Sequence, residues 1–201
     1  MAQSLPVIDI KPLRCMSDAA AVGSTAQQID AACRDFGFFY ATGHGIAPIV
    51  VANLLAASRA FFELPDSDKA KIAMDKGGSA WRGWFPLAGE LTLGIPDLKE
   101  GLYLGEELGD DDPRVAAGLP LHGANLSPDA VPALRPAVEV YLDAATRAGE
   151  ALMRGMALAL GLDANHFARG LTLNPTLLFR IFHSRHRFWC RIRGGLRCRR
   201  A

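Results

Sequence analysis

The stretch Asp35-Phe36-Gly37-Phe38-Phe39-Tyr40-Ala41-Thr42-Gly43-His44-Gly45-Ile46 decides the expected fold, because it passes from a helical to an extended pattern. Gly37 is expected to end a helix, since glycine is favoured just past helix ends. Residues 38–42 are aromatic, apolar and β-branched, which predicts a buried strand. The two glycines around His44 favour a tight turn, because glycine adopts backbone angles that other residues avoid. The stretch therefore predicts helix, strand and turn in succession.

The flanking segments extend this alternation of strands and helices. Residues 5–10, LPVIDI, are rich in branched side chains and predict a short strand. Ser24 and Thr25 each have a glutamine three residues later, a capping-box spacing that places a helix start there. Pro48 suits the first turn of a second helix, because its missing N–H is not needed at that position.

The rest of the chain completes a mixed α and β pattern. Residues 75–127 hold much of the glycine and proline and predict loops. A long helix is expected over residues 136–160, because apolar side chains recur there at helical spacing. The other expected elements are short helices over residues 66–74 and 163–169 and strands over residues 101–107 and 177–183. The fold class is therefore α+β.

The composition is that of an ordinary globular protein. Of the 201 residues, 50% are hydrophobic and 21% are charged, which argues against disorder. No apolar run approaches the roughly 20 residues of a membrane helix, and the N-terminus has no signal-peptide pattern. We therefore expect no membrane partner and a cytoplasmic location. The four cysteines, at positions 15, 33, 190 and 198, have no CxxC spacing and predict no disulfide framework.

A change of composition divides the chain near residue 184. Residues 184–201 contain seven arginines and no acid, so that removing this +7 from the net +1 leaves residues 1–183 at −6. We expect one domain over residues 1–183 and an irregular arginine-rich tail over residues 184–201. Such a tail is what a shifted reading frame in a GC-rich gene would encode, and a frameshift is our hypothesis for it.

Two other interpretations of the tail remain open. Arginines beside Phe188 and Trp189 could contact nucleic acid, but no nucleic-acid-binding fold accompanies them, so no such partner is predicted. His183, His186 and Cys190 could contribute to a zinc site, but a fourth ligand at natural spacing is missing.

Five short motifs, in order and in register, carry a family resemblance. The first is Pro6-Val7-Ile8-Asp9, and the second is Asp35-Phe36-Gly37-Phe38-Phe39-Tyr40 followed by Gly43-His44-Gly45-Ile46. The others are Phe61-Phe62-Glu63-Leu64-Pro65 with Lys69, Arg82-Gly83-Trp84 and Asp97-Leu98-Lys99-Glu100. Together they resemble the N-terminal half of the iron- and 2-oxoglutarate-dependent oxygenases of the isopenicillin N synthase type. The resemblance covers residues 5–183 and implies N-terminal helices and strands of an incomplete double-stranded β-helix, or jelly roll.

The resemblance implies cofactors whose ligands this sequence lacks. In the family, Fe(II) is held by two histidines and one carboxylate, from an HxD motif and a later histidine. An RxS motif holds the 2-oxoglutarate carboxylate. None of the five histidines here is followed two residues later by Asp or Glu, and the C-terminal part has no RxS. We therefore assign no catalytic or metal residue and expect this truncated chain to bind neither cofactor.

Three residues are candidates for substrate binding. The resemblance places Arg82 near the substrate entrance, where it could pair with a carboxylate, and Trp84 and Tyr103 could line the same entrance. A surface arginine and two core aromatic residues are the alternative. His44 could be a ligand or base, but a structural role in its turn is favoured.

Two functions follow. The first is a small-molecule oxidoreductase, including the ethylene- or succinate-forming type. The second is a non-catalytic fragment or interaction module. In the second case the apolar face of the long helix, with Val138, Leu142, Leu152 and Met156, would be partly exposed and favour self-association.

Overall fold

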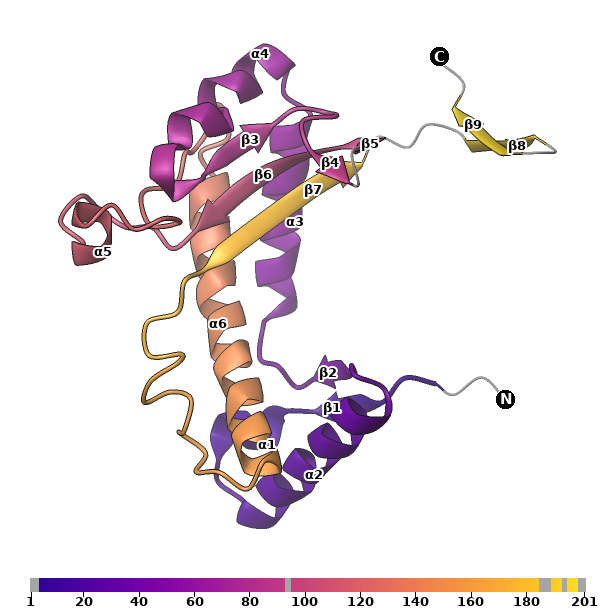
Figure 1. Cartoon of the computed structure of the whole chain (residues 1–201), viewed down its shortest axis with the longest axis vertical. Coiled ribbons are helices and arrows are strands. Elements are labelled where there is room, and N and C mark those ends of the chain that lie inside the picture. The colour runs from indigo at the N-terminus through magenta and orange to yellow at the C-terminus, as the bar shows by residue number, and fades with distance from the viewer. Residues whose placement is uncertain (1–3, 93–94, 185–188, 193–194, 199–201) are drawn as a thin grey trace. The chain divides into compact units, whose positions relative to one another are not determined.

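A computed structural model describes residues 4–92, 95–184, 189–192 and 195–198 (Figure 1). The chain forms two compact units. The first unit comprises residues 1–57 and 133–177, and the second comprises residues 58–132 and 178–201. Each unit is described by itself below.

The first unit is built on two short parallel strands with helices between them. Strand β1 (Val7–Asp9) pairs with β2 (Tyr40–Thr42), and α1 (Lys11–Cys15) and α2 (Ala19–Asp35) connect them. The expected strand over residues 5–10 is therefore confirmed. Apolar side chains of β1, α1, α2 and the long helix α6 (Leu134–Ala159) form the core, which consists of Ile8, Ile10, Leu13, Val22, Ile29, Ala32 and Ala151.

Helix α2 begins earlier than the capping-box spacing predicts. The residue at its N-cap is Asp18, whose Oδ1 accepts hydrogen bonds from the backbone N–H of Ala20 at 3.0 Å and of Ala21 at 3.1 Å. A carboxylate satisfies the free N–H groups of the first turn and favours the positive end of the helix dipole. Ser24 lies inside the helix, so the predicted start at Ser24 or Thr25 is wrong.

Strand β2 is shorter and more exposed than predicted. Phe38 precedes it and is 61% exposed, and Tyr40 within it is 62% exposed. A two-stranded sheet covered on one side leaves the other side chains open, so the prediction of a buried strand is wrong there. The unusual backbone angles predicted for the two glycines after β2 are confirmed, with φ of 63° at Gly43 and 79° at Gly45.

Helices α3 and α6 lie close to their predicted positions. Helix α3 spans Pro48–Phe62, and α6 spans Leu134–Ala159. On α6, Val138 is 2% exposed, while Leu152 and Met156 pack against the core of the first unit. Leu142, Leu152 and Met156 are half-buried, so this apolar face is partly covered, and self-association through it stays a prediction. Residues 163–169 form turns, not the predicted short helix.

The second unit contains a three-stranded antiparallel sheet. Its strand order is β3 (Gly83–Phe85), β6 (Lys99–Gly105) and β7 (Leu178–Ser184), with β6 in the centre. A small hairpin joins β4 (Leu91–Thr92) to β5 (Ile95–Pro96). The short strands β3, β4 and β5 also lie within residues 75–127, so the expectation of a single strand there is wrong. The glycines and prolines of this segment favour loops in the sequence and hide these short strands. The remaining elements of this unit are α4 (Asp66–Lys69), η1 (Ala70–Ile72), η2 (Met74–Ala80) and α5 (Pro113–Ala116).

The arginine-rich tail is not irregular throughout. Ser184 continues β7, and β8 (Trp189–Ile192) pairs antiparallel with β9 (Gly195–Cys198). Tryptophan and isoleucine favour extended backbone, which accounts for strand structure where composition suggested none. The frameshift hypothesis stays a prediction. The zinc interpretation depends on His186, and the nucleic-acid interpretation depends partly on Phe188; both residues lie outside the described residues.

Among the described residues, no single helix is long and apolar enough to cross a membrane. The pair formed by α3 and residues Asp66–Ile72, bent by 110°, meets the same criteria of length and composition together. Cys15 and Cys33 are exposed free thiols, which agrees with the expectation of no disulfide framework for these two.

Candidate functional site

The sheet of the second unit separates the candidate residues onto two faces. Tyr103 of β6 lies opposite Arg180 of β7, while Glu100 lies opposite His183. Trp84 of β3 lies opposite Leu102, on the same face as Glu100. Because side chains alternate along a strand, Tyr103 and Trp84 point to opposite faces. They therefore do not line one common surface.

Arg82, just before β3, is a core residue of this unit. Its side chain is 1% exposed, and its Nη2 donates a hydrogen bond to the backbone oxygen of Leu121 at 2.8 Å. Burial lowers the pKa of Arg82, and the negative charge of Glu107 opposes that shift. Arg82 therefore joins the start of β3 to the loop before α6, and its role in substrate binding stays a prediction.

Trp84 belongs to a buried polar cluster around Glu100. The Nε1 of Trp84 donates to Oε2 of Glu100 at 3.0 Å, and Nζ of Lys69 lies 2.6 Å from the same oxygen. His183 contacts the other carboxylate oxygen, with 3.0 Å between Nδ1 and Oε1. Burial raises the pKa of Glu100, but the hydrogen bonds from His183, Lys69 and Trp84 outweigh it and leave the pKa lowered. The cluster has the character of a stabilising core network.

Tyr103 organises the polar groups on the other face. Its hydroxyl donates to Oε1 of Glu90 and accepts from Nη1 of Arg180 at 3.1 Å. Burial and the contact with Glu90 raise the pKa of Tyr103, against the opposing effect of Arg180. The guanidinium carbon of Arg180 lies 5.4 Å from the centre of the Tyr103 ring and 5.3 Å from that of Phe182. Both distances are within the range of cation–π attraction.

Arg180 is the residue on this face whose side chain is best placed to bind a ligand. It is exposed, and although the negative charge of Glu90 helps to raise the pKa of Arg180, no described carboxylate lies within salt-bridge distance of its guanidinium. The neighbouring Lys99, by contrast, contacts Asp97 at 2.8 Å and Glu90 at 3.3 Å. The sequence offered one signal for Arg180, namely the alternation of Arg180 and Phe182 with Phe179 and Ile181 along the predicted strand.

Aromatic rings surround Arg180 and Tyr103. Phe85 lies 5.6 Å from Tyr103 and 6.2 Å from Phe182 between ring centres, and Trp81 lies 5.4 Å from Tyr103. The rings of Phe85 and Phe182 approach over Gly101, where an added Cβ would lie 2.4 Å from Phe85 and 2.9 Å from Phe182. The face therefore combines aromatic surface with one available guanidinium.

The described residues do not fit an iron centre. No group of three or more His, Cys, Asp or Glu side chains among them could hold a metal ion. His183 contacts Glu100 through Nδ1, and Nδ1 of His44 accepts a hydrogen bond from the backbone N–H of Ile46 at 3.1 Å. No catalytic step through iron follows from these residues.

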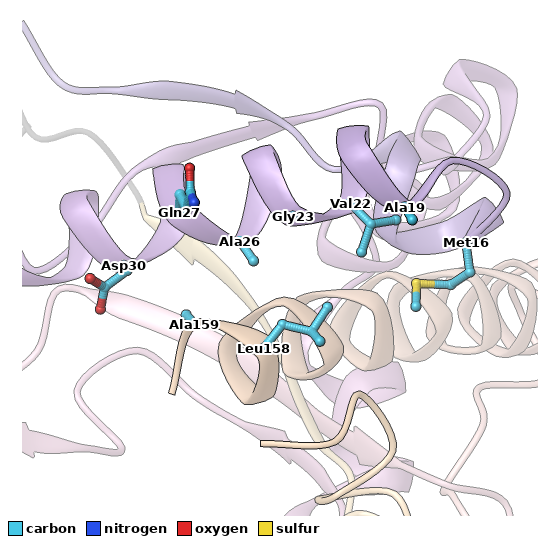
Figure 2. A pocket seen from close by; sticks show the side chains of 9 residues that line it. All are labelled: Met16, Ala19, Val22, Gly23, Ala26, Gln27, Asp30, Leu158 and Ala159. Carbon is cyan, nitrogen blue, oxygen red and sulfur yellow. The ribbon is translucent and has the colours of Figure 1, made fainter. Parts of the chain in front are cut away.

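A cavity of about 540 Å³ lies in the first unit, between α2 and the end of α6 (Figure 2). Figure 2 shows Val22 and Ala26 of α2 facing Leu158 of α6. The lining is largely apolar, and its one carboxylate, Asp30, is already paired with Arg34 at 2.9 Å. The cavity therefore lacks the polar groups that catalysis would need.

Comparison with known proteins identifies the family to which the sequence is similar. Residues 5–130 match the family described as "non-haem dioxygenase in morphine synthesis N-terminal". A probable iron/ascorbate oxidoreductase of Dictyostelium discoideum is 40% identical over 189 residues, which cover 90% of this chain and 52% of that protein. Isopenicillin N synthase of Streptomyces clavuligerus is 34% identical over 180 residues, which cover 86% of this chain and 52% of the synthase.

A solved structure shares the fold. The crystal structure of a putative 2OG-Fe(II) oxygenase family protein from Caulobacter crescentus superposes with a TM-score of 0.75 at 21% identity. The match covers 90% of this chain and 56% of that one. This chain spans about half the length of the curated relatives it matches. By the family match and these identities, the chain belongs to the iron- and 2-oxoglutarate-dependent oxygenases of the isopenicillin N synthase type.

Proposed function

We propose that this chain is the N-terminal part of an Fe(II)- and 2-oxoglutarate-dependent oxidoreductase that acts on a small molecule bearing a carboxylate. The family supports the reaction class. The observation that carries the substrate class is Arg180, an exposed guanidinium without an ion-pair partner among the described carboxylates. The ethylene- or succinate-forming type suggested by the sequence is one form that this activity could take.

The surroundings of Arg180 favour a carboxylate ligand. A guanidinium presents parallel N–H groups that match the two oxygens of a carboxylate. One of its nitrogens, Nη1, is already held by the Tyr103 hydroxyl, which limits the freedom of the side chain. Less conformational entropy is then lost when a ligand binds.

The aromatic residues supply the apolar part of such a site. Phe182 is 41% exposed and Trp81 is 50% exposed, so both rings present surface to solvent. A small ligand could place its carboxylate against Arg180 and its apolar portion over these rings. The work of these residues would be to bind and orient, which contributes to rate by fixing the reacting geometry.

A second proposal concerns the chain by itself. We propose that the chain alone is not catalytically competent. No histidine in its 201 residues is followed two positions later by Asp or Glu, which supports this proposal. The purified chain should be incubated with Fe(II), 2-oxoglutarate and ascorbate, with iron binding and succinate release as the measurements. We expect neither; one iron bound per chain would contradict this proposal.

The oxygenase proposal needs a complete enzyme. In a chimera, residues 1–183 would be followed by the C-terminal half of the Dictyostelium relative. We expect release of succinate from 2-oxoglutarate in this chimera. Arg180→Gln should lower kcat/KM for carboxylate substrates by about 10- to 100-fold, since a charge-assisted hydrogen bond contributes about 1.5–3 kcal/mol. Arg59→Gln, on the exposed side of α3, is the matched control.

If the chimera folds but does not consume 2-oxoglutarate, the proposed reaction class fails. If it is active but Arg180→Gln and Arg59→Gln affect kcat/KM equally, the reaction class stands and the proposed substrate class fails.

A further inference from the structure

A small basic pocket lies in the first unit, where α1 and the turn after β2 meet α6. Its volume is about 240 Å³. Three arginines, one histidine, one glutamate, one glycine and one alanine line it, namely Arg14, Arg147, Arg154, His44, Glu150, Gly45 and Ala144. All of these residues belong to the first unit, and none of them takes part in the site on the three-stranded sheet.

The Gly43-His44-Gly45 turn is built around Arg14. The Nη1 of Arg14 donates a hydrogen bond to the backbone oxygen of Gly43 at 3.0 Å. A Cβ at Gly45 would lie 2.1 Å from the guanidinium carbon of Arg14, so a side chain there would displace that group from its present position. The turn thus holds one guanidinium at the pocket wall, with two of its nitrogens not used by Gly43.

His44 adds a further donor. Its Nδ1 accepts the hydrogen bond from the backbone N–H of Ile46 at 3.1 Å, so the proton of the neutral ring lies on Nε2. A histidine fixed in this tautomer offers an N–H, and not a lone pair, at its second nitrogen. The glycine-flanked histidine can therefore donate a hydrogen bond to a ligand through Nε2.

The arginines of the pocket differ in how far they are neutralised. Arg147 is paired with Asp143, at 2.8 Å from Nη1 and 2.5 Å from Nη2. Within the described ranges, the polar contacts of Arg154 are long, at 3.5 Å to the backbone oxygen of Leu13 and 4.0 Å to Glu150. Among the described residues, no carboxylate lies within ion-pair distance of Arg14. Two guanidiniums therefore lack close neutralisation.

We propose that this pocket binds a phosphate group, either inorganic phosphate or the phosphate of a small monoester. Phosphate carries nearly two negative charges near neutral pH and three or more acceptor oxygens. It can therefore accept from Arg14, Arg154 and His44 at once, whereas a single carboxylate has only two oxygens. The volume of about 240 Å³ lies below the roughly 300 Å³ at which pockets for drug-sized ligands begin, so the ligand is small.

The test is a titration of the full chain with inorganic phosphate, methyl phosphate and glutarate, followed by calorimetry and by the thermal midpoint. Glutarate carries two charges on carboxylates and controls for charge alone. Arg154→Gln is the main variant, because the long contacts of Arg154 make its loss a small structural change. Arg169→Gln is the matched control, since it removes one positive charge from the same unit outside the pocket, where Arg169 pairs with Asp163 at 3.2 Å.

We expect the wild-type chain to bind phosphate saturably. The dissociation constant should increase at least about tenfold in Arg154→Gln, which corresponds to about 1.4 kcal/mol, and less than about twofold in Arg169→Gln. Arg154→Lys should recover part of the affinity. Tighter binding of methyl phosphate than of inorganic phosphate identifies a monoester as the ligand, and the reverse identifies free phosphate.

Three results would overturn the proposal: no saturable binding to the folded chain, equal losses in the two glutamine variants, or glutarate binding as tight as phosphate. Phosphate binding is measured on the chain alone, so its outcome is independent of the oxygenase activity.

Discussion

Nζ of Lys69 lies 2.6 Å from Oε2 of Glu100, and both side chains are buried in the second unit. The pair joins the end of α4 to the central strand β6. The same oxygen of Glu100 accepts the Nε1 hydrogen bond of Trp84, so one carboxylate fixes residues from three elements. A buried pair of this kind is costly to break, because one partner is left as an uncompensated charge.

Removal of Lys69 alone should strongly destabilise the chain. Lys69→Met leaves Glu100 buried without its cation, and we expect a loss of about 3–5 kcal/mol in the free energy of unfolding. Urea unfolding followed by circular dichroism measures this loss. The double variant Lys69→Met/Glu100→Leu should be less destabilised than Lys69→Met, because no buried charge remains. A double variant that loses the sum of both single losses would argue against the coupling.

The lowered pKa of Glu100 predicts a specific dependence of stability on pH. A carboxylate with a lower pKa in the folded than in the unfolded chain stabilises above its unfolded value, near 4.5, and that stability is lost as pH falls through the folded pKa. The urea midpoint of the wild-type chain should therefore fall on acidification below about pH 4.5. Glu100→Gln, less stable at neutral pH, should show a shallower fall. Parallel acid limbs in the two proteins would contradict the assignment.

Arg82 should matter for stability more than its sequence position suggests. Arg82→Ala removes the buried hydrogen bond to Leu121, and we expect a loss of about 3 kcal/mol. Arg59→Ala, on an exposed position of α3, should change stability by no more than about 0.5 kcal/mol. Denaturant titration compares the two. A similar small effect of both variants would place Arg82 among surface residues, as the alternative sequence interpretation had it.

Substitution by alanine should destabilise the chain more at Gly45 than at Gly37, a glycine with a similar φ angle. Gly37 has φ of 78° and open space around a would-be Cβ, so Gly37→Ala carries only the cost of left-handed backbone, about 1 kcal/mol. Gly45→Ala would also push the end of the Arg14 side chain aside and break its hydrogen bond to Gly43, so we expect it to lose about 0.5–1.5 kcal/mol more. Thermal unfolding of the two variants measures the difference. Equal losses would mean that Arg14 moves aside freely.

Local signals in the sequence predicted much of the fold. Pro48 marks the start of α3, the glycines around His44 mark a turn, and the apolar stripe of α6 places that helix within two residues of its ends. These features depend on residues close in the chain. The start of α2 was missed because Asp18 and the capping-box residues are competing local signals, and the carboxylate at Asp18 prevails.

The candidate site depended on contacts that no local pattern encodes. Tyr103 and Arg180 are 77 residues apart, and Glu100 and His183 are 83 apart. Only the register of β6 with β7 brings them together. The same register separates Tyr103 from Trp84, which the sequence placed at one entrance. A family resemblance can order motifs along the chain, but the face on which each side chain lies is set by strand pairing.

Strand β7 pairs through one edge only, with β6, among the residues that the structure describes. No strand among the described residues pairs with its other edge, which runs along a strand of seven residues. An open strand edge can form backbone hydrogen bonds with a further strand, either from the same chain or from a second molecule. Preparations of this protein should therefore be handled dilute. If they form β-rich oligomers over time, the growth is expected to proceed by backbone pairing along β7 and to depend on protein concentration.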